Sequence, residues 1–180
     1  MIRNVHERTL AATPEEVGAL VDSLSSPGDR LWPAARWPAM RLDAPLARGA
    51  RGGHGPVRYW VESYEPGLRV VFRFEHATRL EGTHRLEIEP AAGGHTVLRH
   101  VAEGRPYGWM RLGWPLCFRW LHDAAVEDAL DRAQAELAGR AWEHRPLSVR
   151  VRALRAATAW LRSRKASGAH GDRGELAPLS

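Results

Sequence analysis

The chain has 180 residues, of which 44% are hydrophobic and 26% charged, a composition typical of one globular domain with a sizeable core. No apolar run approaches the roughly 20 residues needed to cross a bilayer, which excludes a membrane-spanning helix. The net charge of +5 comes from residues 140–180, which hold nine Arg or Lys against three Asp or Glu. Residues 1–139 are therefore nearly neutral, and we expect no nucleic-acid binding by the folded part.

Two features of the sequence predict the compartment of the protein. The single cysteine, Cys117, rules out an intrachain disulfide and is typical of a reducing environment. Residues 2–10 have the polar spacing of a strand and not the apolar run of a signal peptide. We therefore expect a cytoplasmic protein.

A strand over residues 2–10 is expected to lead into a short helix. Thr13 can cap the helix, Pro14 suits its first position, and Glu16 completes a capping box three residues after Thr13. Apolar residues at helical spacing continue the helix to Leu24. The sequence predicts that the helix ends in the Ser-Ser-Pro-Gly that follows.

The next segment lacks a clear period. In residues 29–43 two tryptophans each precede a proline, which favours extended backbone, so we expect a loop with at most one helical turn. The glycine-rich residues 49–55 are expected to form a turn or bulge. They do not resemble a phosphate loop, because such a loop opens a helix and this one precedes a strand pattern.

Four segments then alternate apolar and polar residues with a period of two. They cover residues 57–62, 69–75, 85–89 and 96–102, separated by turn signals. Antiparallel strands with one wet face give this pattern, which predicts a meander. In the last strand two alternations compete, so the sequence does not decide whether His100 faces inward.

From Pro115 to Gly139 the apolar period changes to that of a long helix. The residues that share the apolar face are Phe118, His122, Val126, Ala129, Leu130, Ala133 and Leu137. The acidic residues Asp123, Glu127 and Asp131 are expected on the opposite side. The predicted fold class is α+β, with a curved antiparallel sheet wrapped around the long C-terminal helix.

The sequence resembles the START-like (SRPBCC) superfamily, also called polyketide cyclase/dehydrase-like, over about residues 2–139. The residues that carry the resemblance are Val5–Leu10 with Ala12–Val17, Gly55–Tyr59 with Tyr64–Gly67, and His122-Asp123 with Glu127-Asp128 on the long helix. The resemblance implies a helix-grip fold with a deep hydrophobic cavity. Members include lipid and sterol carriers, aromatic polyketide cyclases and coenzyme Q-binding proteins. No cyclase residue set is matched here.

Two functions are compatible with this reading of the sequence. The first is binding or carriage of a hydrophobic small molecule, such as a lipid, an isoprenoid or a polyketide-like compound, in an internal cavity. The alternative is a cyclase or dehydrase that uses pocket His and Tyr side chains as acid–base groups, without metal. Nothing in the sequence indicates a cofactor.

Inward-facing positions of the predicted strands and helix supply the candidate site residues. Tyr59, His84 and His122 are the candidate catalytic groups, and they can equally be satisfied core residues. The expected ligand-binding residues are Trp37, Tyr59, Phe72, Phe74, His76, His84, Leu86, Phe118, His122 and Val126. No metal site is predicted, because the nine histidines include no closely spaced ligand pair.

The C-terminal part is expected to differ from the domain over residues 1–139. Residues 140–165 read as a basic amphipathic helical extension, and residues 166–180 as a disordered tail. The stripe over residues 147–165 is compatible with weak contact to a membrane surface or a protein partner, or with packing on its own domain. The sequence leaves open whether the protein is a monomer or a homodimer.

Overall fold

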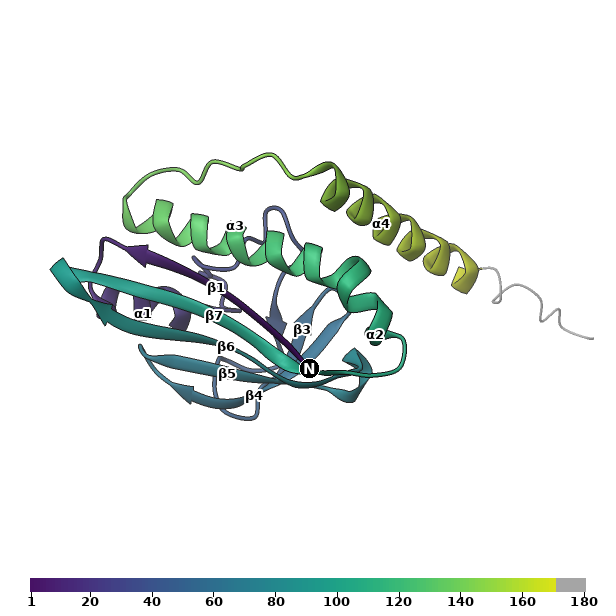
Figure 1. The fold of residues 1–180 in the computed structure, drawn as a ribbon, viewed down its shortest axis with the longest axis horizontal. Coiled ribbons are helices and arrows are strands. Elements are labelled where there is room, and N and C mark those ends of the chain that lie inside the picture. Colours follow the sequence, from purple (N-terminus) through teal and green to yellow (C-terminus); the bar gives the residue numbers. More distant parts are fainter. Residues whose placement is uncertain (171–180) are drawn as a thin grey trace, which may run out of the picture. The chain divides into compact units, whose positions relative to one another are not determined.

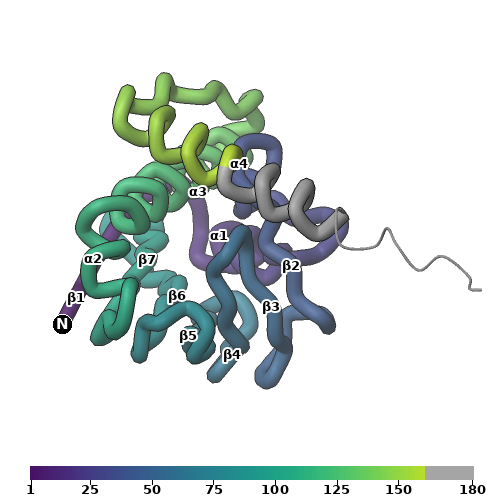
Figure 2. The backbone as a smooth tube through the Cα atoms, turned by 90° about the vertical axis from the view of Figure 1, so that its right-hand side faces the viewer, coloured from purple at the N-terminus to yellow at the C-terminus, as the bar shows by residue number. Residues whose placement is uncertain are grey.

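Seven strands form one antiparallel sheet in the computed structural model, which describes the backbone of residues 1–170 and the side chains of residues 1–160. The sheet order is β1-β7-β6-β5-β4-β3-β2, so the first strand lies beside the last (Figure 1). The strands are β1 (Ile2–Leu10), β2 (Arg41–Leu42), β3 (Arg51–His54), β4 (Val57–Glu65), β5 (Arg69–Phe74), β6 (Leu80–Ala91) and β7 (His95–Pro106). An end-on view shows the sheet as a curved layer (Figure 2).

The predicted meander is confirmed as strands β4 to β7. Each strand pairs with the next one in the chain, and the register places Phe72 opposite His84 and His84 opposite Ala102. Strand β1 closes the order by pairing with β7 from Ile2↔Gly104 to Leu10↔Thr96. Short one-turn helices, η1 (His76–Thr78) and η2 (Ala92–Gly94), occupy the connections on either side of β6.

Helix α1 (Pro14–Asp22) begins as its sequence predicts. Thr13 Oγ1 accepts from the Glu16 backbone N–H at 3.3 Å, and Glu16 Oε2 accepts from the Thr13 backbone N–H at 2.8 Å. These two hydrogen bonds satisfy donors that the first helical turn cannot pair internally. The helix buries Val17, Leu20 and Val21 and contacts β6 and β7.

The glycine-rich segment 49–55 was expected to form a turn or bulge, and most of it is instead strand β3. Gly52 lies where β2 passes so closely that a Cβ atom would come within 1.9 Å of the Arg41 carbonyl oxygen. A Cβ atom on Gly53 would come within 1.9 Å of the Val57 carbonyl oxygen. The glycines therefore permit close pairing of strands, and turns remain only at the ends of the segment, at Gly49 and at Gly55 with its neighbour Pro56.

The long helix begins earlier than predicted. Helix α2 (Met110–Gly113) continues through a π-helical turn, η3 (Trp114–Phe118), into α3 (Arg119–Leu137). Figure 1 shows α3 running along β1 over one face of the sheet. A curved antiparallel sheet with one long helix makes this an α+β fold of the helix-grip type.

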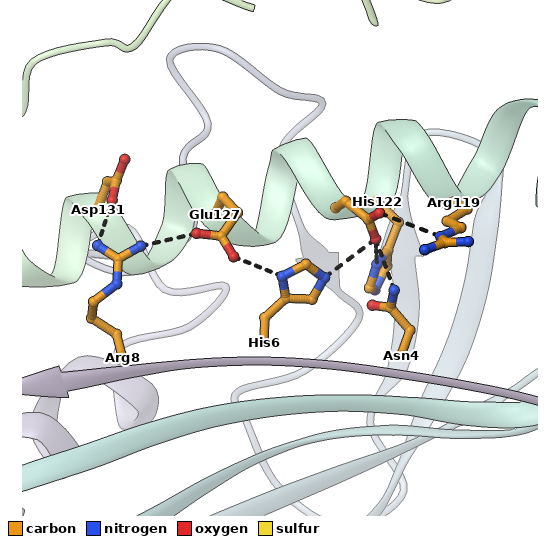
Figure 3. A network of polar contacts seen from close by, with 8 residues as sticks. Asn4, His6, Arg8, Arg119, His122, Glu127 and Asp131 are labelled. Carbon is orange, nitrogen blue, oxygen red and sulfur yellow. Dashed lines mark hydrogen bonds and ion pairs between the residues drawn. The ribbon is translucent and has the colours of Figure 1, made fainter. Parts of the chain in front are cut away.

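The acidic stripe of α3 is the main correction to the expected orientation of the helix. Asp123, Glu127 and Asp131 were expected on the side away from the sheet, but their carboxylates contact inward side chains of β1 (Figure 3). The reason lies in the strand, because its inward positions Asn4, His6 and Arg8 are polar and require polar partners.

Residues Met1–Arg145 and Pro146–Ser180 form separate compact units. The described part of the second unit contains helix α4 (Val149–His170), which covers most of the extension predicted over residues 140–165. Residues 171–180, the larger part of the predicted disordered tail, lie outside the described residues. Among the described helices, none combines the length and the apolar character needed to span a membrane.

Candidate functional site

The inner face of the sheet carries a wall of aromatic and imidazole rings contributed by neighbouring strands. At its centre His84 of β6 stacks on Phe72 and Phe74 of β5, with ring centroids 4.8 and 5.0 Å apart. Tyr59 of β4 meets His84 edge-on at 4.7 Å. The period-two alternation of each strand places these side chains on one face, and the register aligns them across strands. We call this set, with the residues added below, the ring wall.

Further rings extend the wall in both directions. On the β7 side His100 lies 5.6 Å from His84, and His122 of α3 lies 5.0 Å from His100, between ring centroids. On the β3 side His54 lies 5.6 Å from Tyr59, and its Nδ1 hydrogen-bonds with the tyrosine hydroxyl at 3.0 Å. The ring wall therefore runs from β3 across the sheet to α3.

Burial keeps the imidazoles of the ring wall neutral. It lowers the pKa of His54 to about 3 and the pKa values of His84 and His100 well below their ordinary value, and neighbouring histidines and Arg58 add to the effect. Burial also lowers the pKa of His122 and raises that of Tyr59. At neutral pH the wall thus presents imidazole lone pairs and N–H groups without charge.

Several ring nitrogens of the wall lack a protein partner. His84 Nε2, His100 Nδ1 and His122 Nδ1 are buried, and no hydrogen-bond partner for them exists among the described residues. The other nitrogens of the first two rings face each other, with His84 Nδ1 3.4 Å from His100 Nε2. Buried polar groups in native proteins are nearly always paired, so these atoms mark a place where a ligand group can bind.

The expected site residues fall into two groups. The ring wall brings together Tyr59, Phe72, Phe74, His84 and His122, and Leu86 is half-buried on the same face opposite His100. Val126 is buried on α3, and Phe118 is half-buried in η3 beside Trp109. Whether any of them binds a ligand stays a prediction.

Two expected residues do not join the wall. His76 is exposed, because β5 ends at Phe74 and the chain turns into η1, where the His76 ring lies against Tyr107. Trp37 is buried in the loop before β2, and its indole N–H donates to Asp128 Oδ2 at 2.7 Å. Arg36 binds the other oxygen of this buried carboxylate at 3.1 Å. Trp37 therefore fastens the loop to α3.

The sequence did not identify two residues of the ring wall, His54 and His100, or the neighbouring His6. His54 was assigned to a turn because its strand has no apolar alternation, and His100 was left undecided between two alternations. The burial of Thr96 and Leu98 shows that His100 shares the inner face with them. His6 carried no signal of its own, since both alternations of β1 are polar.

A second polar cluster joins β1 to α3 beside the wall, and we call it the β1–α3 zipper. Arg8 donates to Asp131 at 2.6 Å and to Glu127 at 2.9 Å (Figure 3). His6 lies between two carboxylates, with Nδ1 2.7 Å from Glu127 Oε1 and Nε2 3.2 Å from Asp123 Oδ1. Asn4 donates to the same Asp123 oxygen at 2.9 Å.

In the zipper, charged neighbours raise the pKa of a histidine, whereas burial in the wall lowers the pKa values of the histidines. Burial alone lowers the pKa of His6, but the hydrogen bonds and charges of Asp123 and Glu127 outweigh it and raise the pKa above the ordinary value. Burial alone raises the pKa of Asp123, but His122, His6 and Asn4 hold it well below its ordinary value. The zipper is therefore an ionic contact, only partly screened from solvent.

A recess of about 270 Å³ lies elsewhere, where the end of β1 meets the end of α3. Its lining consists of Thr9, Leu10, Ala11, His95, Gln134, Leu137, Ala138 and Arg140. None of the wall residues contributes to this lining, so the recess is separate from the ring wall.

Comparison with known proteins supports the fold. No protein-family model matches the chain, and no curated protein matches it. A Thermobifida fusca protein has a TM-score of 0.58 and 16% identity, covering 81% of this chain and 99% of its own. CalU16 from Micromonospora echinospora has a TM-score of 0.53 and 16% identity, covering 89% and 86%. XoxI from Bacillus cereus has a TM-score of 0.57 and 12% identity, covering 77% and 96%. At these identities the likeness shows the fold alone.

Proposed function

We propose that this protein binds a hydrophobic small molecule against the ring wall, between the sheet and α3. The observation that carries the proposal is the set of buried ring nitrogens without a partner. Leaving such a group unpaired costs about 1–3 kcal/mol, which a ligand that bonds to it recovers. An apolar surface with a few convergent polar groups is the usual composition of a small-molecule site.

The paired histidines narrow the chemistry of the ligand. When His84 Nδ1 donates to His100 Nε2, the free His84 Nε2 is a lone pair and the free His100 Nδ1 is an N–H; the reverse direction exchanges the two roles. In either case the wall offers one donor and one acceptor. A flat ring compound that carries both a carbonyl and a hydroxyl group is complementary to this pair, with Phe72 and Phe74 supplying the apolar surface.

The finer family assignment belongs to the same proposal. We infer that the chain is a START-like (SRPBCC) protein, since the sequence resemblance and the helix-grip fold agree. A second function within that family is acid–base catalysis of cyclisation or dehydration. The feature that favours it is the contact between the rings of His84 and Tyr59. The imidazole of His84 is neutral, which is the form that a general base requires, and the Tyr59 ring beside it carries a protonated hydroxyl group.

Ligand binding is tested by native mass spectrometry of the purified full-length protein and by titration with a naphthol-type ring compound and its unsubstituted naphthalene parent. The variant His84→Phe keeps a ring in the wall and removes its polar atoms. We expect at least a tenfold loss of affinity for the hydroxylated compound and little change for naphthalene. The exposed His76→Phe is the matched control.

The alternatives give different results. Binding of neither compound, with no co-purified small molecule, contradicts the proposal. Equal affinity of wild type and His84→Phe for the hydroxylated compound contradicts the role given to the imidazole. Turnover of a polyketide-like substrate that is lost in both His84→Phe and Tyr59→Phe favours the enzyme.

A further inference from the structure

The start of α3 places three ligand-type atoms from two elements close together. His6 Nε2 of β1 lies 3.2 Å from Asp123 Oδ1, and His122 Nδ1 lies 3.6 Å from the same oxygen. His6, His122 and Asp123 each offer one ligand-type atom, and these atoms lie within 4.8 Å of one another. Zinc bonds of about 2.0–2.2 Å in tetrahedral geometry hold neighbouring ligand atoms about 3.4 Å apart, so both contacts to Asp123 are close to the required spacing.

The orientation of His6 is that of a metal-ligating histidine. Its Nδ1 is 2.7 Å from Glu127 Oε1, and because a carboxylate accepts, this nitrogen carries the hydrogen. Nε2 then carries a lone pair, which faces an oxygen of the second carboxylate, Asp123. Two lone pairs that face each other repel. A positive species must lie between Nε2 and Asp123, either a second proton or a metal ion. A carboxylate behind a ligating histidine is a common arrangement at zinc.

His122 supplies an independent observation. Its Nδ1 is buried, and its contact with Asp123 Oδ1, at 3.6 Å, is longer than a normal hydrogen bond. A single proton on His6 leaves this nitrogen unsatisfied, whereas a metal ion bound to Asp123 would engage it. Asn4 donates to Asp123 Oδ1 and Arg119 lies 3.7 Å from Oδ2, so both carboxylate oxygens are oriented.

We propose that His6 Nε2, His122 Nδ1 and Asp123 Oδ1 bind a divalent transition metal ion, with zinc as the expected occupant. Two imidazoles and one carboxylate are a common ligand set for zinc and for other first-row metals. Three protein ligands leave at least one coordination position open, as in catalytic zinc sites. Glu127 orients His6, and Asn4 orients Asp123, from behind the ligands. The site is distinct from the paired His84 and His100, although His122 belongs to both clusters.

The test is metal binding by the full-length chain, freed of any tag and stripped with a chelator. Calorimetric titration with Zn²⁺ is expected to show one ion per chain, and Co²⁺ is expected to give the visible absorption of a tetrahedral site. His6→Asn and Asp123→Asn should each weaken Zn²⁺ binding at least tenfold. The control His95→Asn removes an exposed histidine and should leave the affinity unchanged.

A variant that keeps all three ligands serves as the control for effects on folding. Glu127→Gln keeps all three ligand atoms and should weaken Zn²⁺ binding about 10- to 100-fold, the effect usual for a partner behind a ligating histidine. Circular dichroism of the metal-free proteins checks that each variant is folded. The proposal is overturned if wild type binds no Zn²⁺ saturably, or if its affinity equals that of Asp123→Asn. Retained ligand binding in His6→Asn would leave the ring-wall proposal standing.

Discussion

The ring wall and the β1–α3 zipper shift the pKa of the same kind of side chain in opposite directions. In the wall, His54, His84 and His100 lie among aromatic rings and other imidazoles, and burial drives their pKa values down. In the zipper, His6 is also largely buried, with a side chain 13% exposed, but two carboxylates contact it and raise its pKa. Burial alone therefore does not decide the direction in which the pKa of a histidine shifts here, because carboxylates within hydrogen-bond reach can outweigh it.

The ring wall and the zipper also stabilise the fold in different ways. The wall contributes apolar area and ring contacts, whose loss creates cavities and unpaired nitrogens. The zipper contributes charge pairs, whose loss leaves a partly buried carboxylate with fewer partners. Substitutions in the two regions should therefore differ in their dependence on pH and on salt.

The largest effect is expected from breaking the zipper at Arg8. Its side chain is 20% exposed and binds Asp131, which is only 10% exposed, as well as Glu127. Arg8→Ala removes the cation that these two carboxylates share, while Asp131 keeps its contact with Arg145 and Glu127 keeps its contact with His6. We expect the free energy of unfolding to fall by about 2–3 kcal/mol. Chemical denaturation at pH 7 measures it.

A matched control lies on the same strand. Arg3 points outward, is 67% exposed and reaches Glu103 only at 3.9 Å. Arg3→Ala should change the free energy of unfolding by less than about 0.5 kcal/mol. Equal effects of Arg8→Ala and Arg3→Ala would mean that the zipper contributes no more than a surface ion pair.

Local patterns predicted the elements but not the facing of α3. The capping box at Thr13 and the alternations in β4 to β7 involve residues close in sequence, so their geometry follows from the chain itself. The zipper depends on β1 lying beside β7, some 90 residues away in register, and this pairing has no local signature. Helical period separates apolar from acidic faces, but it cannot show that the acidic face meets Arg8.

The candidate site was predictable to the same extent. Tyr59 and His84 follow from strand alternation, because Tyr59 lies between Val57 and Val61 and His84 shares a face with Leu86 and Ile88. His54 was not predicted, because β3 contains glycines that permit the close approach of neighbouring strands. These glycines leave no apolar alternation in the sequence. His6 and His122 come together only through the docking of a strand on a helix, so no spacing rule for metal ligands applies to them.

The second effect concerns the pH dependence that the buried histidines of the wall give to stability. His54 is neutral in the folded protein, with its pKa lowered to about 3 by burial, and regains an ordinary pKa on unfolding. Below about pH 6.5 the unfolded chain therefore binds more protons, and stability falls as the pH decreases, with the loss continuing down to the folded pKa. At pH 5 this histidine accounts for at most about 2 kcal/mol of that loss.

The variant His54→Phe isolates this contribution. It removes the titrating group, so the free energy of unfolding should decline less steeply between pH 6.5 and pH 5 than in wild type. His95→Phe replaces an exposed histidine and should leave the slope as in wild type. An unchanged slope in His54→Phe would contradict a neutral, buried imidazole at this position.

The smallest effect is expected from removing one hydroxyl in the wall. Tyr59 is fully buried, and its hydroxyl lies 3.0 Å from His54 Nδ1. Tyr59→Phe keeps the ring contacts with Phe72 and His84 but leaves that nitrogen unpaired, so we expect a loss of about 1 kcal/mol in thermal or chemical unfolding. The double variant Tyr59→Phe/His54→Phe removes both polar partners and should recover part of the loss, because no unpaired group remains. If the loss in the double variant equals or exceeds the sum of the two single losses, the hydroxyl and the imidazole do not act as a pair.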